Sequence, residues 1–325
     1  MFTLAHLADL HAPPVTVNRP GDLLSKRLSG FISWTLRRRH VFRREILDAV
    51  LADVKGQQAD HIAITGDLVN LALEEEFVAA AKWLERIGTA DHVSVVPGNH
   101  EAYVAVPMER SWNHLAGYMV SDLAETGTRI DPDDFPTVRV RGPVAIVGLC
   151  SAQPTGLFRA TGRIGAEQLR RLESVLDELR DRGLCRIVQI HHPPVDDGLP
   201  ARRRLTDGEG VRDVLARAGA ELVLHAHAHK TAFHSLEGPD GSIPSVGVRS
   251  ATNGGHEPLE LAQYHLYDIE ETADADATRR YRITVRSREW EEASGTFVAA
   301  GERRLAQGDD TERSRPGRPA ARAAA

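Results

Sequence analysis

Residues 60–67 read Asp60-His61-Ile62-Ala63-Ile64-Thr65-Gly66-Asp67, a short apolar run followed by a glycine and a carboxylate. A β-branched run that stops at a glycine is typical of a buried strand that ends in a turn. Four further apolar runs end in a similar way, in Asp9-Leu10-His11, Gly98-Asn99-His100-Glu101, His191-His192-Pro193-Pro194 and His225-Ala226-His227-Ala228-His229. The chain therefore repeats one arrangement, a strand that delivers Asp, Asn or His at its carboxyl end.

Strand and helix patterns alternate through most of the chain. Short β-branched runs predict strands over 2–8, 61–65, 92–96, 138–140, 144–149, 186–190 and 222–224. Apolar residues at helical spacing predict helices over 42–54, 74–87, 166–182 and 210–218. The alternation predicts an α/β fold with a largely parallel sheet covered on both faces. Because ligands gather at the carboxyl ends of such strands, the five clusters are expected to meet there.

The pattern changes after residue 230. Strand candidates over 232–236, 245–249, 259–269 and 280–287 predict hairpins that complete a second sheet, with helices outside the resulting sandwich. From Gly301 onward the sequence consists largely of Arg, Ala, Gly, Pro and acidic residues. The expected organisation is one domain over 1–300 and a disordered tail over 301–325.

Composition narrows the class of protein. The 325 residues are 42% hydrophobic and 26% charged, as in a globular protein with an ample core. A net charge of -6 indicates no nucleic-acid partner. Without a signal-peptide pattern or a long apolar run, the sequence predicts a cytoplasmic protein. Cys150 and Cys185 lie in separate apolar runs and are expected to be buried and reduced.

The ligand types indicate a particular chemistry. Asp, Asn and His without cysteine suit divalent transition metals that also hold an oxygen substrate. A pair of such ions, about 3.5–4 Å apart, needs a bridging carboxylate, and Asp67 stands alone at its strand end. The ions lower the pKa of bound water from about 15.7 toward about 7, which provides a metal-bound hydroxide for in-line attack on phosphorus. These residues therefore predict a binuclear phosphohydrolase.

The ordered set Asp-x-His, Gly-Asp, Gly-Asn-His-Glu, His-x-Pro and His-x-His resembles the calcineurin-like metallophosphoesterase superfamily over residues 3–230. The His-His-Pro-Pro stretch and residues 224–229 are most similar to its bacterial branch of cyclic-nucleotide phosphodiesterases. The resemblance implies a four-layer αββα metallophosphoesterase sandwich. It also implies that His100 contacts the phosphoryl or leaving-group oxygen as an acid or electrostatic stabiliser. The implied metal ligands are Asp9, His11, Asp67 and His229 for one ion, and Asp67, Asn99, His191 and His227 for the other.

Neighbouring histidines and two substitutions leave choices within this pattern. His227 and His229 are preferred to His225, and His191 to His192, by alignment with the family pattern rather than by spacing. Ala226 replaces a frequent glycine, which is tolerated unless the position needs positive φ. Glu101 replaces a frequent aspartate. His192 and His225 are then expected beside the ligands or facing the substrate.

Residues 19–44 form a basic, amphipathic insertion after the first predicted strand. From Lys26 to Arg44 it has seven Lys and Arg residues and no acid, interleaved with apolar side chains. Leu24, Leu28 and Phe31 have helical spacing. Two interpretations remain: an apolar side packed on the domain, or residues 22–44 at a membrane surface or over an anionic or lipid-bearing substrate. In either case the insertion is expected near the metal site, because it follows the loop of Asp9 and His11.

The expected activity is metal-dependent hydrolysis of a phosphodiester, such as a cyclic nucleotide or small diester. The expected cofactors are two divalent metal ions, from among Mn2+, Fe2+/Fe3+, Zn2+ and Co2+. One alternative is a hydrolase of a lipid-linked pyrophosphate or phospholipid-like diester, peripheral at the inner membrane surface. Another is a catalytically inactive binding scaffold. Substrate selection is expected from the insertions at 12–40 and 102–135 and from the C-terminal hairpins.

Overall fold

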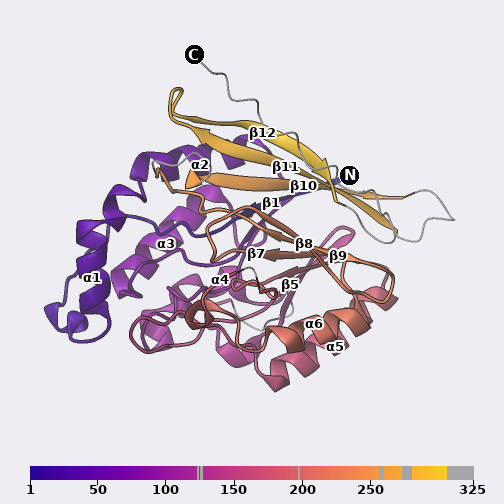
Figure 1. Ribbon diagram of the computed structural model, residues 1–325, viewed down its shortest axis with the longest axis horizontal. Helices are drawn as coiled ribbons and strands as arrows, with labels where there is room; N and C mark the ends of the chain where they lie inside the picture. Colours follow the sequence, from indigo (N-terminus) through magenta and orange to yellow (C-terminus); the bar gives the residue numbers. More distant parts are fainter. Residues whose placement is uncertain (123, 125–126, 197, 256–259, 273–279, 306–325) are drawn as a thin grey trace, which may run out of the picture.

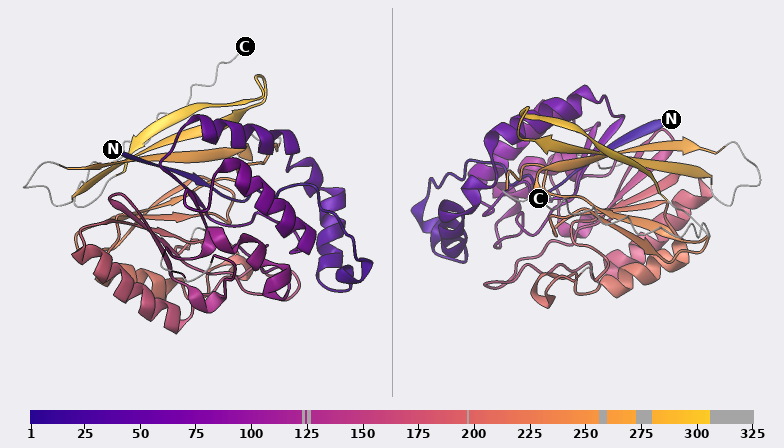
Figure 2. Two further views of the ribbon diagram at one scale, coloured as in Figure 1. Left: turned by 180° about the vertical axis from the view of Figure 1, so that it is seen from behind. Right: turned by 45° about the horizontal axis from the view of Figure 1, so that its top comes forward.

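The computed structural model describes residues 1–122, 124, 127–196, 198–255, 260–272 and 280–305. Two six-stranded sheets lie face to face, and the longer helices lie outside them (Figures 1 and 2). This is the predicted four-layer αββα arrangement. It follows from apolar runs that are buried on both faces, which need a second sheet on one side and helices on the other.

The first sheet has the strand order β12-β11-β10-β1-β2-β3. Its parallel half is β1 (Phe2–Leu7), β2 (His61–Ile64) and β3 (Val93–Val95), and its antiparallel half is β10 (Gln263–Glu271), β11 (Tyr281–Glu291) and β12 (Thr296–Arg304). Two helices, α2 (Arg44–Gly56) and α3 (Glu74–Ile87), cover its outer face. They bury Ile46, Val50 and Phe77 because these residues recur on one side of each helix.

The second sheet has the strand order β4-β5-β6-β7-β9-β8. Its strands are β4 (Thr137–Arg141), β5 (Val144–Gly148), β6 (Cys185–Gln189), β7 (Leu222–His225), β8 (Ala232–Leu236) and β9 (Ile243–Gly247). Two helices, α5 (Ala166–Asp181) and α6 (Gly208–Ala218), pack on its outer face, where Leu172, Leu176 and Leu215 are buried.

The two sheets share a core of their own. Leu4 and Tyr267 of the first sheet pack in one buried cluster with Ile146, Ile187 and Leu224 of the second. Burial of such side chains stabilises a fold by roughly 1.5–3 kcal/mol each, before conformational entropy is counted. The packed sheets therefore give a rigid base for the loops at their edges.

Two further helices lie outside this framework. The longer one, α1 (Arg27–Leu36), confirms the helix expected in the basic insertion, and it lies at the edge of the molecule in every view. The other, α4 (Ala116–Met119), is a single short turn. In the part of the chain that the structure describes, no helix has both the length and the apolar character needed to cross a bilayer.

The sequence did not correctly divide the strands between the sheets. The hairpin of β8 and β9 joins the second sheet as expected, but β10 pairs antiparallel with β1 and extends the first sheet. The second sheet already begins at β4, well before residue 230. Strand pairing between distant segments depends on tertiary packing, which a local pattern does not report.

The predicted tail also begins too early. Residues 301–304 belong to β12, which pairs with β11 through Arg304 opposite Thr284. The strand was missed because its Ala-Ala-Gly stretch lacks β-branched residues and because a register shift at Ser287 and Arg288 breaks the alternation. The remainder of the predicted tail, 306–325, lies outside the described residues. Cys150 and Cys185 are free and buried, as expected.

Candidate metal centre

The predicted ligands lie where the carboxyl edges of both sheets meet. In the first sheet, β1, β2 and β3 run parallel side by side and lead into Asp9, Asp67 and Asn99. In the second sheet, the parallel pair β6 and β7 leads into His191 and His227. Residues separated by more than two hundred positions in the sequence are thereby brought together, as expected for loops at one edge of a parallel arrangement.

One group of ligand atoms comes from Asp9, His11 and His229. The Nε2 atom of His229 lies 3.4 Å from Oδ1 of Asp9 and 3.4 Å from Nε2 of His11. The buried Oδ1 atom of Asp9 has no hydrogen-bond donor within the described residues. A cation between these atoms would satisfy all three at once.

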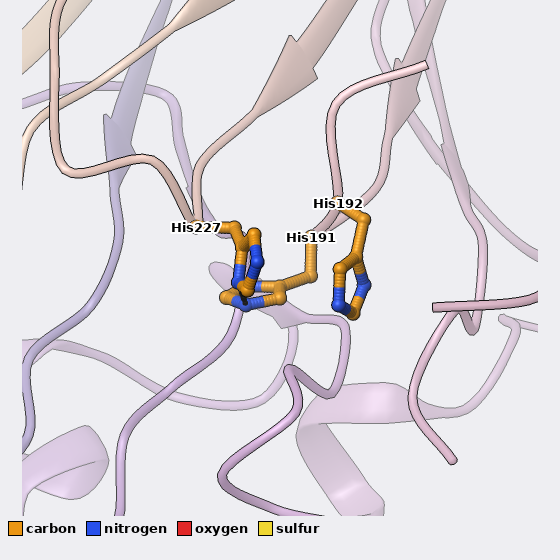
Figure 3. Close-up of side chains that lie close together, drawn as sticks. All are labelled: His191, His192 and His227. Carbon is orange, nitrogen blue, oxygen red and sulfur yellow. Dashed lines mark hydrogen bonds between the residues drawn. The ribbon is translucent and has the colours of Figure 1, made fainter. Parts of the chain in front are cut away.

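A second group comes from Asp67, Asn99, His191 and His227. The Nε2 atom of His191 lies 3.1 Å from Oδ1 of Asn99, 3.2 Å from Nδ1 of His227 and 3.4 Å from Oδ2 of Asp67. Figure 3 shows the rings of His191 and His227 turned toward each other from the ends of their strands. The donors are imidazole nitrogens with carboxylate and amide oxygens, which is the mixed set that divalent transition metals accept.

Asp67 lies between the two groups. Its Oδ2 atom is 3.4 Å from Nε2 of His191, 3.9 Å from Nε2 of His11 and 4.0 Å from Nε2 of His100. Burial by itself would raise the pKa of this carboxyl group, but the facing His191 and His100 lower it well below its ordinary value. Asp67 is therefore an anion at neutral pH and has the position expected of a bridging ligand.

Backbone carbonyls fix the orientation of the imidazole rings. Nδ1 of His191 lies 2.7 Å from the carbonyl of Thr65, and Nε2 of His227 lies 2.9 Å from the carbonyl of Arg203. Because a carbonyl only accepts, each of these nitrogens carries a hydrogen, and the opposite nitrogen is the one that can face a cation. Burial by itself would lower the pKa of His191, but Asp67 and Asp9 raise it to about 9, so Nε2 also carries a proton in the ligand-free protein. A metal ion can replace this proton between Nε2 of His191 and Nδ1 of His227, which are 3.2 Å apart, so the donor set fits a metal ion.

The ligand loops are conformationally strained. Positive φ angles occur at five of the seven predicted ligands, namely Asp9 (50°), His11 (40°), Asp67 (55°), His227 (66°) and His229 (54°). Such angles are costly for residues with a Cβ atom and cluster at functional sites. Close packing adds a further constraint, because a Cβ atom on Gly98 would collide with the Asp67 carboxylate and approach the His191 ring within 2.8 Å.

His100 lies beside the ligands but is held differently. Its Nδ1 donates to the carbonyl of Asn70, its ring stacks on Tyr103, and its Nε2 faces Asp67 across 4.0 Å. Burial lowers the pKa of His100 to about 3, so the ring is neutral in the ligand-free protein. His100 also lines the cavity over the ligands, and its role as an acid or electrostatic stabiliser stays a prediction.

The neighbouring histidines differ from the predicted ligands in their partners, although His192 lies close enough to His191 and His227 for the three rings to hold an ion. His192 uses Nδ1 for Ser151 at 2.8 Å and Nε2 for the carbonyl of Ala160 at 3.2 Å, and its ring lies against that of His227 (Figure 3). His225 is the last residue of β7 and packs under Gly247. These positions are consistent with His191 and His227 as ligands, and the assignment of each residue to an ion stays a prediction.

The two departures from the family pattern have simple structural consequences. Ala226 is not among the residues with positive φ and is buried against Ala8 and Val248, so its methyl group is accommodated. Glu101 points inward, and its carboxylate accepts hydrogen bonds from the backbone N–H groups of Gly98, Asp67, Leu68 and Val69 at 2.7–3.1 Å. The longer side chain thus ties two ligand loops together.

Two arginines near the site were not assigned a role from the sequence. A cavity of about 630 Å³ opens over the ligands and is lined by Arg38 and Arg203, together with Ser33, Arg37 and Phe42. Arg203 donates to the carbonyl of His227, whereas Arg38 lies 3.1 Å from Nδ1 of His11 and has no carboxylate partner among the described side chains. The sequence shows the run Arg37-Arg38-Arg39, but it does not show which of these side chains faces the cavity. As expected, the insertion borders the site.

Comparisons with known proteins agree with this architecture. The sequence profile of the calcineurin-like phosphoesterase family matches residues 2–231. No curated protein matches the sequence. A dimetal phosphatase from Danio rerio is 15% identical, with a TM-score of 0.60 over 92% of this chain and 98% of that one. A purple acid phosphatase from seeds of yellow lupin (Lupinus luteus) is 11% identical, with a TM-score of 0.52 over 93% of this chain and 53% of that one. At these identities the likeness shows a common fold.

Proposed function

The chain belongs to the calcineurin-like phosphoesterase family, and from this premise we propose that it hydrolyses a phosphodiester at a pair of divalent metal ions. The observation that carries the proposal is the convergence of metal-ligating atoms from Asp9, His11, Asp67, His191 and His227. An inactive binding scaffold would not need to maintain this cluster of buried ligands on a strained backbone.

The ions would supply positive charge for the phosphoryl oxygens and would activate water as the nucleophile. Two side chains of the protein would take part beside the ions. Asp67 lies between the two groups of donors, and His100, whose Nε2 atom is 4.0 Å from Oδ2 of Asp67, lines the cavity that a substrate would enter. In the ligand-free protein this Nε2 atom holds no proton, so we propose that His100 takes up a proton when an anionic substrate binds beside it and passes that proton to the departing alkoxide.

The size and charge of the cavity support a diester. The cavity extends beyond the ligands to Ser33, Val41 and Phe42, which leaves room for a second group on phosphorus. The Arg38 guanidinium faces the same space without a carboxylate partner in the described part of the chain, so it is suited to bind an anionic phosphoryl oxygen. The narrower resemblance to cyclic-nucleotide phosphodiesterases stays a prediction.

A second candidate is hydrolysis of a lipid-linked pyrophosphate or phospholipid-like diester. The observation that favours it is the exposure of Leu28, Ile32 and Leu36 on α1, beside the cavity to which α1 contributes Ser33. The two candidates share one chemistry and differ in what is attached to phosphorus.

The test is hydrolysis of bis(p-nitrophenyl) phosphate by protein freed of metal and then supplied with Mn2+, Fe2+, Zn2+ or Co2+. We expect turnover to depend on added metal and to disappear in Asp67→Ala, whereas Asp177→Ala, a partly exposed position on α5 that does not line the cavity, retains it. Turnover that persists in Asp67→Ala, or no turnover with any metal, would contradict the proposal. Parallel assays with p-nitrophenyl phosphate and cyclic nucleotides would define the ester class.

A further inference from the structure

Helix α1 exposes large apolar side chains along one side. Leu28, Ile32 and Leu36 are four residues apart and retain 50%, 50% and 70% of their accessible surface, and Leu24 before the helix retains 87%. The sequence interpretation in which this apolar side packs on the domain is therefore wrong for these residues. A continuous row of this kind costs solubility and usually indicates an interaction surface.

The opposite side of α1 fixes its rotation. Arg27 is buried and donates to the carbonyls of Leu71 and Ala72. Trp34, seven residues or about two helical turns later, is buried on the same side. Gly30 lies between them, and a Cβ atom there would approach both Leu71 and Tyr103 within 2.6 Å. Rotation of the helix to bury Leu28 and Leu36 would break the contacts of Arg27, Gly30 and Trp34, so the packing of α1 keeps these leucines exposed.

A loop between β5 and α5 adds to the same surface. Leu157 and Phe158 are 51% and 77% exposed, and Phe158 has a positive φ of 60°. The Nζ atom of Lys26 ties this loop to the start of α1, with contacts of 3.0 Å to Oγ1 of Thr155 and 3.2 Å to the carbonyl of Arg159. Six of the eight exposed large apolar residues among those described thus lie on two connected segments. We call these six residues, Leu24, Leu28, Ile32, Leu36, Leu157 and Phe158, the apolar patch.

Cations accompany the apolar patch. Arg37, Arg39 and Arg159 are exposed and form no ion pair within the described ranges. Arginines on the helices of the second sheet behave differently, because Arg170 pairs with Glu167 at 2.7 Å and Arg217 pairs with Glu173 at 2.7 Å. Although the protein as a whole is acidic, residues 19–44 contain eight Lys and Arg residues against one acid, Asp22. The surroundings of the patch therefore attract an anionic partner.

The patch is continuous with the mouth of the cavity. Ser33 and Arg37 from the α1 segment and Ala160 from the loop all line it. A surface that binds the patch would consequently lie beside the predicted metal ions, at the side from which a substrate enters.

We infer that the apolar patch docks on an anionic lipid bilayer, with its leucines and phenylalanine in the interface and its arginines on acidic headgroups. A continuous row of exposed apolar side chains on one side of a helix, flanked by arginines that form no ion pair in the described part of the chain, fits the boundary between acyl chains and headgroups. Docking places the cavity next to phosphate esters that have a lipid part. The choice of a lipid-linked substrate rests on the proposed hydrolase activity, whereas docking does not.

The test is co-sedimentation of the full-length protein with vesicles. We expect wild type to pellet with vesicles of phosphatidylcholine and phosphatidylglycerol but not with phosphatidylcholine alone, and to be released by high salt. The double variant Leu28→Gln/Ile32→Gln should lose at least about tenfold in the bound fraction, because it removes apolar area from the interface. Its matched control is Val78→Gln, an exposed apolar position on α3 outside the patch.

A second comparison tests the role of charge. It uses the double variant Arg39→Glu/Arg159→Glu, with Arg170→Glu on α5 as the control. We expect only the first to weaken binding to the acidic vesicles. The inference is overturned if wild type remains in the supernatant with acidic vesicles, if the double variant pellets like wild type, or if binding does not depend on the acidic lipid. It is also overturned if sedimentation velocity shows a wild-type dimer that the double variant dissociates, because the patch would then bind a second copy.

Hydrolysis of bis(p-nitrophenyl) phosphate in the absence of vesicles separates this inference from the proposed function. Neither Leu28 nor Ile32 lines the cavity, so the double variant should keep the wild-type rate on this small substrate. Activity without vesicle binding would overturn docking alone, and vesicle binding without activity would overturn the hydrolase alone.

Discussion

The predicted metal centre and helix α1 border the same cavity, and each departs from the usual rule that polar side chains are exposed and apolar side chains are buried. The metal centre buries polar groups, whereas α1 exposes apolar ones. At the metal centre, Asp9, Asp67 and His191 are buried although they are polar or charged. On α1, Leu28 and Ile32 are exposed although they are apolar. Each arrangement is unfavourable without a partner, for which we propose a cation in the first case and a lipid interface in the second. The difference indicates what each region binds.

The two regions also differ in how their geometry is maintained. The ligand loops have a strained backbone at Asp9 and Asp67, and the inward carboxylate of Glu101 holds them in this conformation through hydrogen bonds. Helix α1 is held by one buried face with Arg27 and Trp34. Substitutions at the metal centre should therefore alter chemistry and stability together, whereas those on the outer side of α1 should alter neither.

The largest effect is expected for Asp67→Ala. Loss of the bridging carboxylate removes several kcal/mol of transition-state stabilisation, which corresponds to at least about a 10³-fold fall in kcat/KM. Steady-state hydrolysis of a chromogenic diester with saturating Mn2+ measures it. If Asp67→Ala fell no further than the Asp177→Ala control, the buried cluster would not be a metal centre.

Glu101→Ala should mainly reduce stability. The substitution leaves the backbone N–H groups of Gly98, Asp67, Leu68 and Val69 without their acceptor. Since each unpaired buried donor costs roughly 1–3 kcal/mol, the free energy of unfolding should fall by at least about 3 kcal/mol. Urea unfolding of the metal-free protein measures the loss, and Glu101→Gln, which keeps one acceptor oxygen, should lose less. An unchanged midpoint would show that the loops do not depend on this residue.

Arg38→Ala should weaken substrate binding more than it weakens the fold. A charged hydrogen bond to a phosphoryl oxygen is worth about 1.5–3 kcal/mol, so kcat/KM should fall about 10- to 100-fold. Arg39→Ala is the control, because Arg39 is adjacent in sequence but does not line the cavity. Equal effects of the two substitutions would indicate that the guanidinium of Arg38 does not face the substrate.

The smallest effect is expected for Leu28→Gln. The side chain is half exposed and does not line the cavity, so thermal unfolding and hydrolysis of a small diester should both stay close to wild type, within about 0.5 kcal/mol in stability. On the same helix, Trp34→Ala removes a buried side chain and should cost about 3 kcal/mol or more. A large loss of stability in Leu28→Gln would mean that the apolar side of α1 packs on the protein.

Much of the architecture could be predicted because it depends on local patterns. The helix over 74–87 was predicted with the boundaries that α3 has, since its apolar residues repeat at helical spacing. Strands such as β2 and β6 were found because each is a short β-branched run with a clear end. The pairing of β10 with β1 was missed because partners more than two hundred residues apart leave no local signal. The β12 strand was missed because its Ala-Ala-Gly stretch lacks β-branched residues and a register shift breaks the alternation.

The sequence by itself determined the chemistry of the centre. Asp67, Asn99 and His191 are the residue types that bind divalent metals, and their positions after strands predicted that they would meet. Only the tertiary structure decided which atoms face one another, because ring orientation depends on the carbonyls of Thr65 and Arg203, which arrive from other loops. It likewise decided which side of α1 is exposed. Helical spacing defines a row of apolar residues, but only packing against Leu71 and Tyr103 turned that row toward the solvent.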